Sequence, residues 1–190
     1  PLRAADQPLL GKLVLVKNGE GKVYWPSLGI DRIRTWDPRQ GYQMYLMTAD
    51  VLTYPAGSLM GGRVDILRAP ESPAHFDVCA SVTGSNATVG IPSGTPKLGG
   101  LPPGVSLEAG DELAVFSPSA GMCVGSLVWN GPSDAQALTV WGDNQVTQEL
   151  DGMQEGEEMV WRVWDTSLGM EYEVTVTYQQ GEYYHGNGIY

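Results

Sequence analysis

Hydrophobic and polar residues alternate along much of this chain with a period of two, which is typical of β-strands that have one buried and one exposed face. Residues 171–178 show this pattern most clearly. One face of the segment carries Tyr172, Val174, Val176 and Tyr178, and the other carries Glu171, Glu173, Thr175 and Thr177. We expect the first face to belong to a hydrophobic core and the second to face solvent.

The first part of the chain predicts a small module rich in β-structure. Residues 12–17 alternate, residues 18–21 tolerate the positive φ angles of a tight turn, and residues 22–25 resume the alternation, so a β-hairpin is expected. Residues 29–36 fit either a short strand or a single helical turn. Two further short strands are expected, at residues 41–47 and 52–54.

The second part of the chain has the turn spacing of a β-sandwich, with glycine, proline and other turn-forming residues at intervals of roughly 8 to 15 positions. Strands are expected at residues 76–82, 87–91, 112–116, 123–129, 137–141, 159–164 and 171–178. No long segment has the 3.6-residue period of a helix, and the best helical candidate is a turn at residues 147–153. The predicted fold class is therefore all-β: a small β-hairpin-rich module followed by an antiparallel β-sandwich, with very little helix.

A connector separates the two modules in this interpretation. Residues 56–74 contain several Gly and Ser residues followed by two prolines, which is the composition of a linker between domains. We place the first module at residues 1–58, the connector at residues 59–69 and the sandwich at residues 70–190.

The net charge of −11 is unevenly distributed along the chain. Residues 1–58 hold seven Lys and Arg against five acids, whereas residues 59–190 hold four against 17. So acidic a chain argues against binding to nucleic acid or to anionic membranes, because both need a basic surface. It also lacks the run of roughly 18 apolar residues that a membrane-inserted helix needs. Because the chain does not begin with Met, we expect its start to be a processed or trimmed end of a longer precursor, which is compatible with export.

The two cysteines, Cys79 and Cys123, both fall in predicted strands and are too far apart for a CxxC motif. A disulfide between them is the natural hypothesis, and two buried free thiols are the alternative. A disulfide would close a loop of about 45 residues and stabilise the fold by roughly 4 kcal/mol through the entropy of the unfolded chain.

Several motifs resemble accessory modules of large secreted and cell-surface proteins of Bacteroidota-type bacteria. In the first module these are residues 35–38 (TWDP) and 41–45 (GYQMY) after the hairpin, and in the second they are GDELAVF, CVGSLVW, VWGD and WRVWD. The resemblance implies a non-catalytic accessory role outside the cell. In that family the first module usually opens with a further strand containing Gly-Trp-Asn, which is absent here.

Catalysis has little support in the sequence, and we do not expect an enzyme. The two histidines, His75 and His185, lie in no known catalytic motif, and we expect both in exposed turns. The nucleophile-elbow, zinc-protease and nucleotide-binding motifs are missing. Paired acids such as Asp111 and Glu112 are expected to be solvated surface groups.

Calcium is the one cofactor for which ligands can be named. Asp111, Asp143, Asn144 and Asp151 lie in turn-like segments and carry the oxygen atoms that Ca²⁺ prefers. No EF-hand or glycine-rich repeat spacing supports them, and Asx turns are the more frequent role for such residues.

Tryptophans at the ends of predicted strands suggest a second kind of site. Trp129, Trp141 and Trp164 each adjoin Asn, Gly-Asp or Asp, where an exposed ring would stack on a sugar. The alternative is that these rings close the two ends of the core. The tripeptide Asn86-Ala-Thr88 is also a glycosylation sequon, a pattern that often arises by chance.

The missing first strand suggests assembly instead, because it would leave an open sheet edge in a module near the lower size limit for a stable core. An open edge can accept a strand from another copy, and the two terminal segments are candidates for that strand. The charge asymmetry would favour head-to-tail contacts between copies. The preferred function is a self-assembling subunit of a surface filament, appendage or matrix. The alternative is an accessory module that binds polysaccharide through exposed Trp and Tyr.

Overall fold

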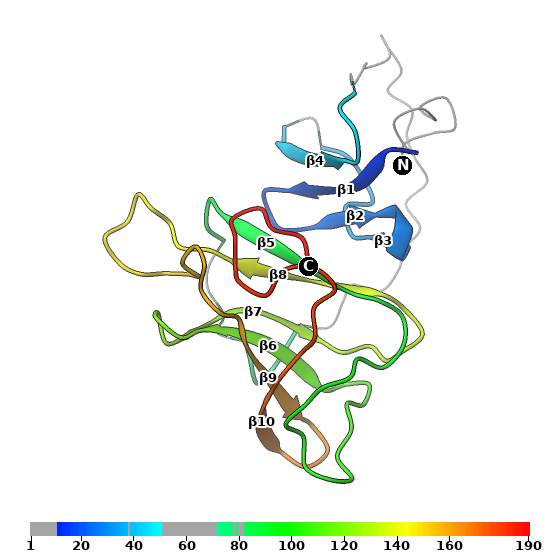
Figure 1. Cartoon of the computed structure of the whole chain (residues 1–190), viewed down its shortest axis with the longest axis vertical. Helices are drawn as coiled ribbons and strands as arrows, with labels where there is room; N and C mark the ends of the chain where they lie inside the picture. The colour runs from blue at the N-terminus through cyan, green and yellow to red at the C-terminus, as the bar shows by residue number, and fades with distance from the viewer. Residues whose placement is uncertain (1–10, 38, 51–71, 78, 80–81) are drawn as a thin grey trace. The chain divides into compact units, whose positions relative to one another are not determined.

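The computed structural model describes residues 11–37, 39–50, 72–77, 79 and 82–190, which fold almost entirely as β-structure (Figure 1). The predicted all-β class is therefore confirmed. The chain forms two compact units, Pro1–Ala69 and Pro70–Tyr190. The predicted connector at residues 59–69 and the predicted strand at residues 52–54 lie outside the described residues.

The described residues of the first unit form an antiparallel sheet with the strand order β3-β2-β1-β4. Its strands are β1 (Leu13–Asn18), β2 (Val23–Trp25), β3 (Ile30–Asp31) and β4 (Tyr42–Leu46). The predicted hairpin is β1 and β2, with Val16 opposite Tyr24. In its turn the Asn18 side chain accepts hydrogen bonds from the amides of Glu20 and Lys22 at 3.1 and 2.9 Å.

A short 3-10 helix, η2 (Pro26–Leu28), links β2 to β3 and ends at Gly29, whose φ of 71° favours glycine. Residues 30–31 pair with β2, so the strand alternative for residues 29–36 is the better one. One face of the sheet packs into a small core made of Leu13, Val16, Ile33, Tyr24, Trp36, Tyr42, Met44 and Leu46.

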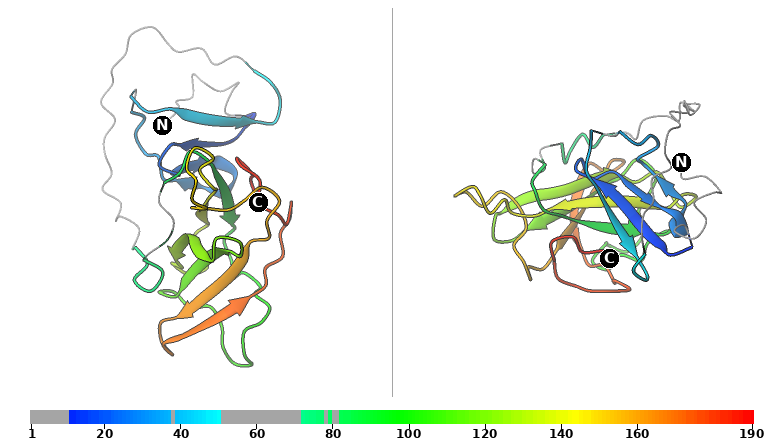
Figure 2. Two further views of the ribbon diagram at one scale, coloured as in Figure 1. Left: turned by 90° about the vertical axis from the view of Figure 1, so that its left-hand side faces the viewer. Right: turned by 90° about the horizontal axis from the view of Figure 1, so that it is seen from above.

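The second unit has two antiparallel sheets, ordered β10-β9-β6-β7 and β5-β8. Their strands are β5 (Asn86–Ile91), β6 (Glu112–Ser117), β7 (Met122–Val128), β8 (Gln136–Trp141), β9 (Val160–Asp165) and β10 (Met170–Val174). β10 forms one edge of the larger sheet beside β9, as the orange strands of Figure 2 show.

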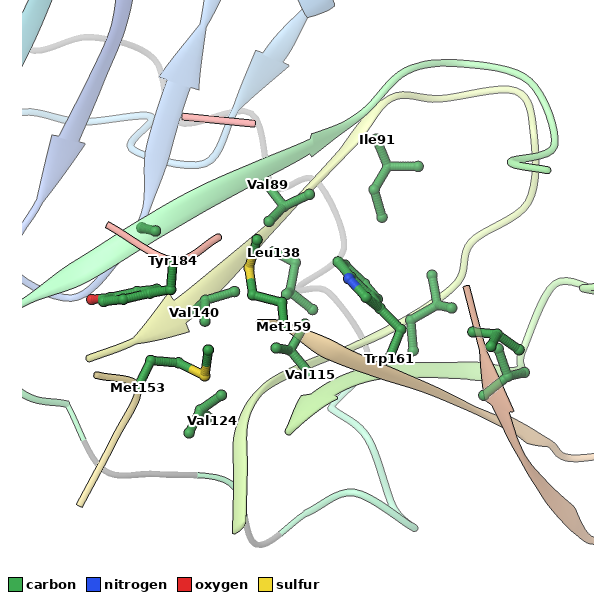
Figure 3. Close-up of a cluster of buried hydrophobic side chains, with 14 of the residues drawn as sticks. Val89, Ile91, Val115, Val124, Leu138, Val140, Met153, Met159, Trp161 and Tyr184 are labelled. Carbon is green, nitrogen blue, oxygen red and sulfur yellow. The ribbon is translucent and has the colours of Figure 1, made fainter. Parts of the chain in front are cut away.

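The main core lies between these two sheets (Figure 3). Val89, Leu138 and Val140 of the smaller sheet pack in one buried cluster with Val115 and Val124 of the larger one. This arrangement is the one that the alternating pattern predicts, because every second residue of each strand points inward. The second unit is thus sandwich-like.

Gly125 brings the two sheets together at one corner. A Cβ atom at this position would lie 2.2 Å from the carbonyl oxygen of Thr139, so β7 can approach the main chain of β8 only because residue 125 has no side chain.

Three sequence predictions need correction here. The described residues of segment 76–82 form no strand. Residues 147–152 form bends and irregular structure, and Met153 forms an isolated bridge to Gly142, so this segment is not helical. β10 stops at Val174, short of the predicted end at residue 178, because Thr175 pairs with Gly99. Alternation nevertheless continues to residue 178, with exposed Thr175 and Thr177.

The last residues of the sequence pair with their own unit. Residues 187–190 run parallel to β5 and exchange main-chain hydrogen bonds with Asn86, Thr88 and Gly90 at 2.9–3.0 Å. This segment therefore fills the outer edge of β5 in the same chain. In the described part of the chain, no helix has the length and apolarity that spanning a membrane requires.

Candidate assembly and binding surfaces

The predicted disulfide is confirmed: Cys79 and Cys123 are bonded, with their Cα atoms 4.5 Å apart. Cys123 lies in β7, so the bond ties the segment around Cys79 to the outer face of the larger sheet. Phe76 packs there in a small buried cluster with Ala114 and Cys123.

Glu112, at the start of β6, holds residues 74–76 through hydrogen bonds. Its side chain is buried, with the residue 5% exposed, and its carboxylate accepts hydrogen bonds from the main-chain amides of Ala74, His75 and Phe76 at 2.6–3.1 Å. Three converging N–H groups offset the cost of burying the carboxylate.

Replacing Glu112 with Gln tests this anchor. A glutamine side chain has only one acceptor oxygen, so its NH₂ group would face main-chain donors, and we expect the free energy of unfolding to fall by about 2 kcal/mol. The matched control is Glu108→Gln, at an exposed position shortly before β6. This change should alter the free energy of unfolding by less than about 0.5 kcal/mol. Urea unfolding of the two variants measures the difference; equal stabilities would refute the anchoring role.

Aromatic and charged side chains form a continuous set of contacts on this outer face. The His75 ring stacks on Trp164 with their centroids 3.8 Å apart, and its Nε2 lies 2.9 Å from the Glu171 carboxylate. Glu171 also accepts a 2.9 Å hydrogen bond from Arg162, whose guanidinium lies over the ring of Phe116. Burial acts to raise the pKa of Glu171, but the hydrogen bonds and charges of His75 and Arg162 outweigh it and hold the pKa below its usual value.

The three tryptophans proposed as a sugar-binding surface do not form one. Trp129 and Trp141 are buried in the main core, which corrects the expectation that their rings are exposed. Trp164 is partly exposed, but His75 covers one face of its ring. A sugar needs an open aromatic face, so the alternative that these rings close the core is the better one for Trp129 and Trp141.

The four candidate calcium ligands are likewise divided. Asp111 precedes β6 and accepts amide hydrogen bonds from Glu108 and Thr166 at 2.7 and 3.0 Å. The residue after Asp111, Glu112, pairs with Val128, and Val128 lies beside Gln136 at the start of β8. The other three candidates instead follow the end of β8.

Asp143, Asn144 and Asp151 do come together beyond β8. Asp143 accepts a hydrogen bond from the amide of Asp151 at 3.0 Å, and Asp151 accepts one from the amide of Asn144 at 2.8 Å, so the two carboxylates hold the ends of this loop together. Within the described ranges, no group of three or more His, Cys, Asp or Glu side chains is arranged to hold a metal ion. Calcium binding by these four residues stays a prediction.

Asn86 of the sequon is also poorly placed for a glycan. It is buried in β5, between β8 and residues 187–190, so folding leaves its side chain little room for a modification.

An acidic hollow of about 350 Å³ lies next to β9 and β10. Two tyrosines, Tyr178 and Tyr183, and three acids, Glu158, Glu173 and Glu182, contribute to its lining. Tyr183 is 52% exposed. Tyr178 accepts a hydrogen bond from the buried indole of Trp161, and burial raises its pKa to about 12, so its hydroxyl stays protonated at neutral pH. Of these acids, Glu173 was expected on a solvent-facing strand surface, and the alternating pattern does not predict the hollow.

The second notable surface is the outer side of β4, the last strand of the first sheet. Its sequence, Tyr-Gln-Met-Tyr-Leu, contains no charged residue, and Met47 just beyond it is 69% exposed. The amide of Met47 donates to the carbonyl of Lys12, 2.8 Å away, on the β1 side. Neighbouring residues of a strand direct their main-chain groups to opposite sides. The main-chain N–H and C=O of Leu46 therefore point away from β1.

The chain matches no protein-family model, no curated protein and no solved structure. The resemblance to Bacteroidota-type modules therefore stays a prediction, and the function has to be argued from the described surfaces.

Proposed function

We propose that this protein is a non-catalytic extracellular structural protein whose copies assemble into a surface filament, appendage or matrix by pairing strand edges. The observation that carries the proposal is the uncharged edge strand β4. Among the described residues only β1 pairs with it.

Proteins that must stay monomeric usually protect their sheet edges with charged residues. Two of the described edge strands, β4 in the first unit and β10 in the second, differ in this respect. β10 carries Glu171 and Glu173 within five residues, whereas β4 has no charge over the same length. An edge without charged residues is the kind that accepts a strand from another molecule through main-chain hydrogen bonds.

An extracellular setting fits the disulfide, because such bonds persist in oxidising compartments and are rare in reducing ones. It also fits an acidic surface that keeps a secreted protein soluble.

Glycan binding, the alternative raised by the sequence, depends on exposed aromatic faces. Two of the three predicted rings are buried and the third is covered on one side, so the described residues support assembly better.

Placing acids on the β4 edge tests the proposal. Gln43 is exposed in the strand and Met47 is exposed just after it, so Gln43→Glu with Met47→Glu should leave the fold intact and abolish large particles in sedimentation velocity runs. The matched control is Leu168→Glu with Met170→Glu, which replaces two exposed apolar residues, one in the β9–β10 turn and one at the start of β10. Particles that persist in the first variant would exclude β4 as the assembling edge.

A further inference from the structure

The strands β9 and β10 part at the acidic hollow. They pair regularly from Asp165 opposite Met170 to Trp161 opposite Val174. One residue later, Thr175 instead exchanges two main-chain hydrogen bonds of 2.9 Å with Gly99, and on the other strand Glu158 bridges to Tyr183. The hollow therefore occupies the place where continued pairing of the two strands would lie.

The segment that follows Thr175 keeps the form of a strand edge. Val176 and Tyr178 pack against the core, while Thr175 and Thr177 are exposed. The main-chain groups of residues 176–178 make no hydrogen bond to any residue in the described part of the chain. A strand from another molecule would satisfy these donors and acceptors.

The charges around the hollow favour a partner that is not acidic. None of the described residues that line it is Lys, Arg or His, and three are Glu. Over the whole chain, unit Pro70–Tyr190 holds two basic residues against 16 acids, whereas unit Pro1–Ala69 holds nine against six. The net charges are therefore −14 and +3, which together give the −11 of the chain, so a first unit is attracted to the second unit of another copy.

We propose that residues 176–178, at the acidic hollow, are the acceptor for the β4 edge of a second copy. This inference rests on the proposed assembly function, in which β4 is one side of the contact between copies, and it names the other side. β4 contributes an uncharged edge, and the unit to which it belongs has a positive net charge. Each copy would then carry one donor edge and one acceptor edge. A contact between two different surfaces propagates from copy to copy and builds a filament when the rotation does not close.

A mixing experiment tests this pairing. The main-chain groups of Thr175 face Gly99, so those of Val176 face the opposite side, where the hollow lies. Val176→Pro removes the main-chain N–H from this edge and should leave the fold intact, because the amide of Val176 makes no hydrogen bond within the described chain. The variant with Gln43→Glu and Met47→Glu loses the donor edge but keeps the acceptor. Each variant alone should sediment as a monomer, and an equimolar mixture should form a heterodimer, since one intact donor meets one intact acceptor.

Charge reversal gives an independent variant in case Val176→Pro fails to fold. Glu158→Lys with Glu182→Lys should raise the dissociation constant of the contact between copies by about tenfold or more, which corresponds to about 1.4 kcal/mol per contact. Glu108→Lys with Glu149→Lys makes the same change of charge at exposed positions away from the hollow and should assemble as the natural sequence does.

The outcomes separate this inference from the proposed function. If the acceptor variants assemble like the natural sequence while the β4 variant does not, or if the mixture stays monomeric, residues 176–178 are not the acceptor and the assembly function stands. If the β4 variant itself assembles, the proposed function fails and the acceptor proposal fails with it.

Discussion

Removing the disulfide is expected to lower the free energy of unfolding by about 4 kcal/mol. Cys79 and Cys123 are 44 residues apart in sequence, and a bond that closes such a loop restricts the unfolded chain by about that amount on the chain-entropy model. The bond also holds the segment that Glu112 anchors, so its loss should loosen the outer face of the larger sheet. Urea unfolding of the Cys79→Ala, Cys123→Ala variant measures the effect.

The natural sequence under reducing conditions is the control for this variant, since it loses the bond without losing any side chain. Both should unfold at similarly reduced urea concentrations, and hydrogen exchange should quicken first at the amides of residues 74–76. A loss below about 1 kcal/mol in both samples would contradict a stabilising role for the disulfide.

Trp129→Ala is expected to destabilise the protein by about 4 kcal/mol, because it removes a large side chain from the main core and leaves a cavity. The residue is fully buried, and its indole N–H has no hydrogen-bond partner among the described residues. Trp129→Phe is therefore the informative comparison, since it keeps a ring and removes an unsatisfied donor; we expect it to cost less than about half as much. Thermal or urea unfolding distinguishes the two.

This substitution also separates a core role from a sugar-binding role. A core role predicts a large loss of stability with Trp129→Ala and no change in mobility on polysaccharide gels when the folded Trp129→Phe variant is compared with the natural sequence. A stable Trp129→Ala variant with altered glycan mobility would contradict the buried position of the ring.

Local patterns in the sequence carried most of the information about individual strands. The alternation of Tyr172 and Val174 with Glu171 and Glu173 follows from the geometry of a single strand, and the structure buries the two faces unequally in the predicted way. The disulfide was predictable for a related reason: the chain has two cysteines, and both were expected in one β-rich unit.

Features that depend on distant segments could not be predicted in this way. A tryptophan at a strand end has the same local sequence whether its ring is exposed or covered, and what covers Trp129 comes from other strands. The hollow arises because Gly99 lies against Thr175, where a Cβ atom would come within 2.3 Å of the Thr175 hydroxyl. The glycine is visible in the sequence, but its partner 76 positions later is not. The three amides that converge on Glu112 are non-local in the same sense.

The mass of the natural sequence in solution, measured by sedimentation velocity over a series of concentrations, tests strand-edge assembly most directly. Assembly through β4 predicts species many times heavier than the 20.5 kDa chain, and their share should grow with concentration. A single species of 20.5 kDa at every concentration, up to the limit of solubility, would contradict it.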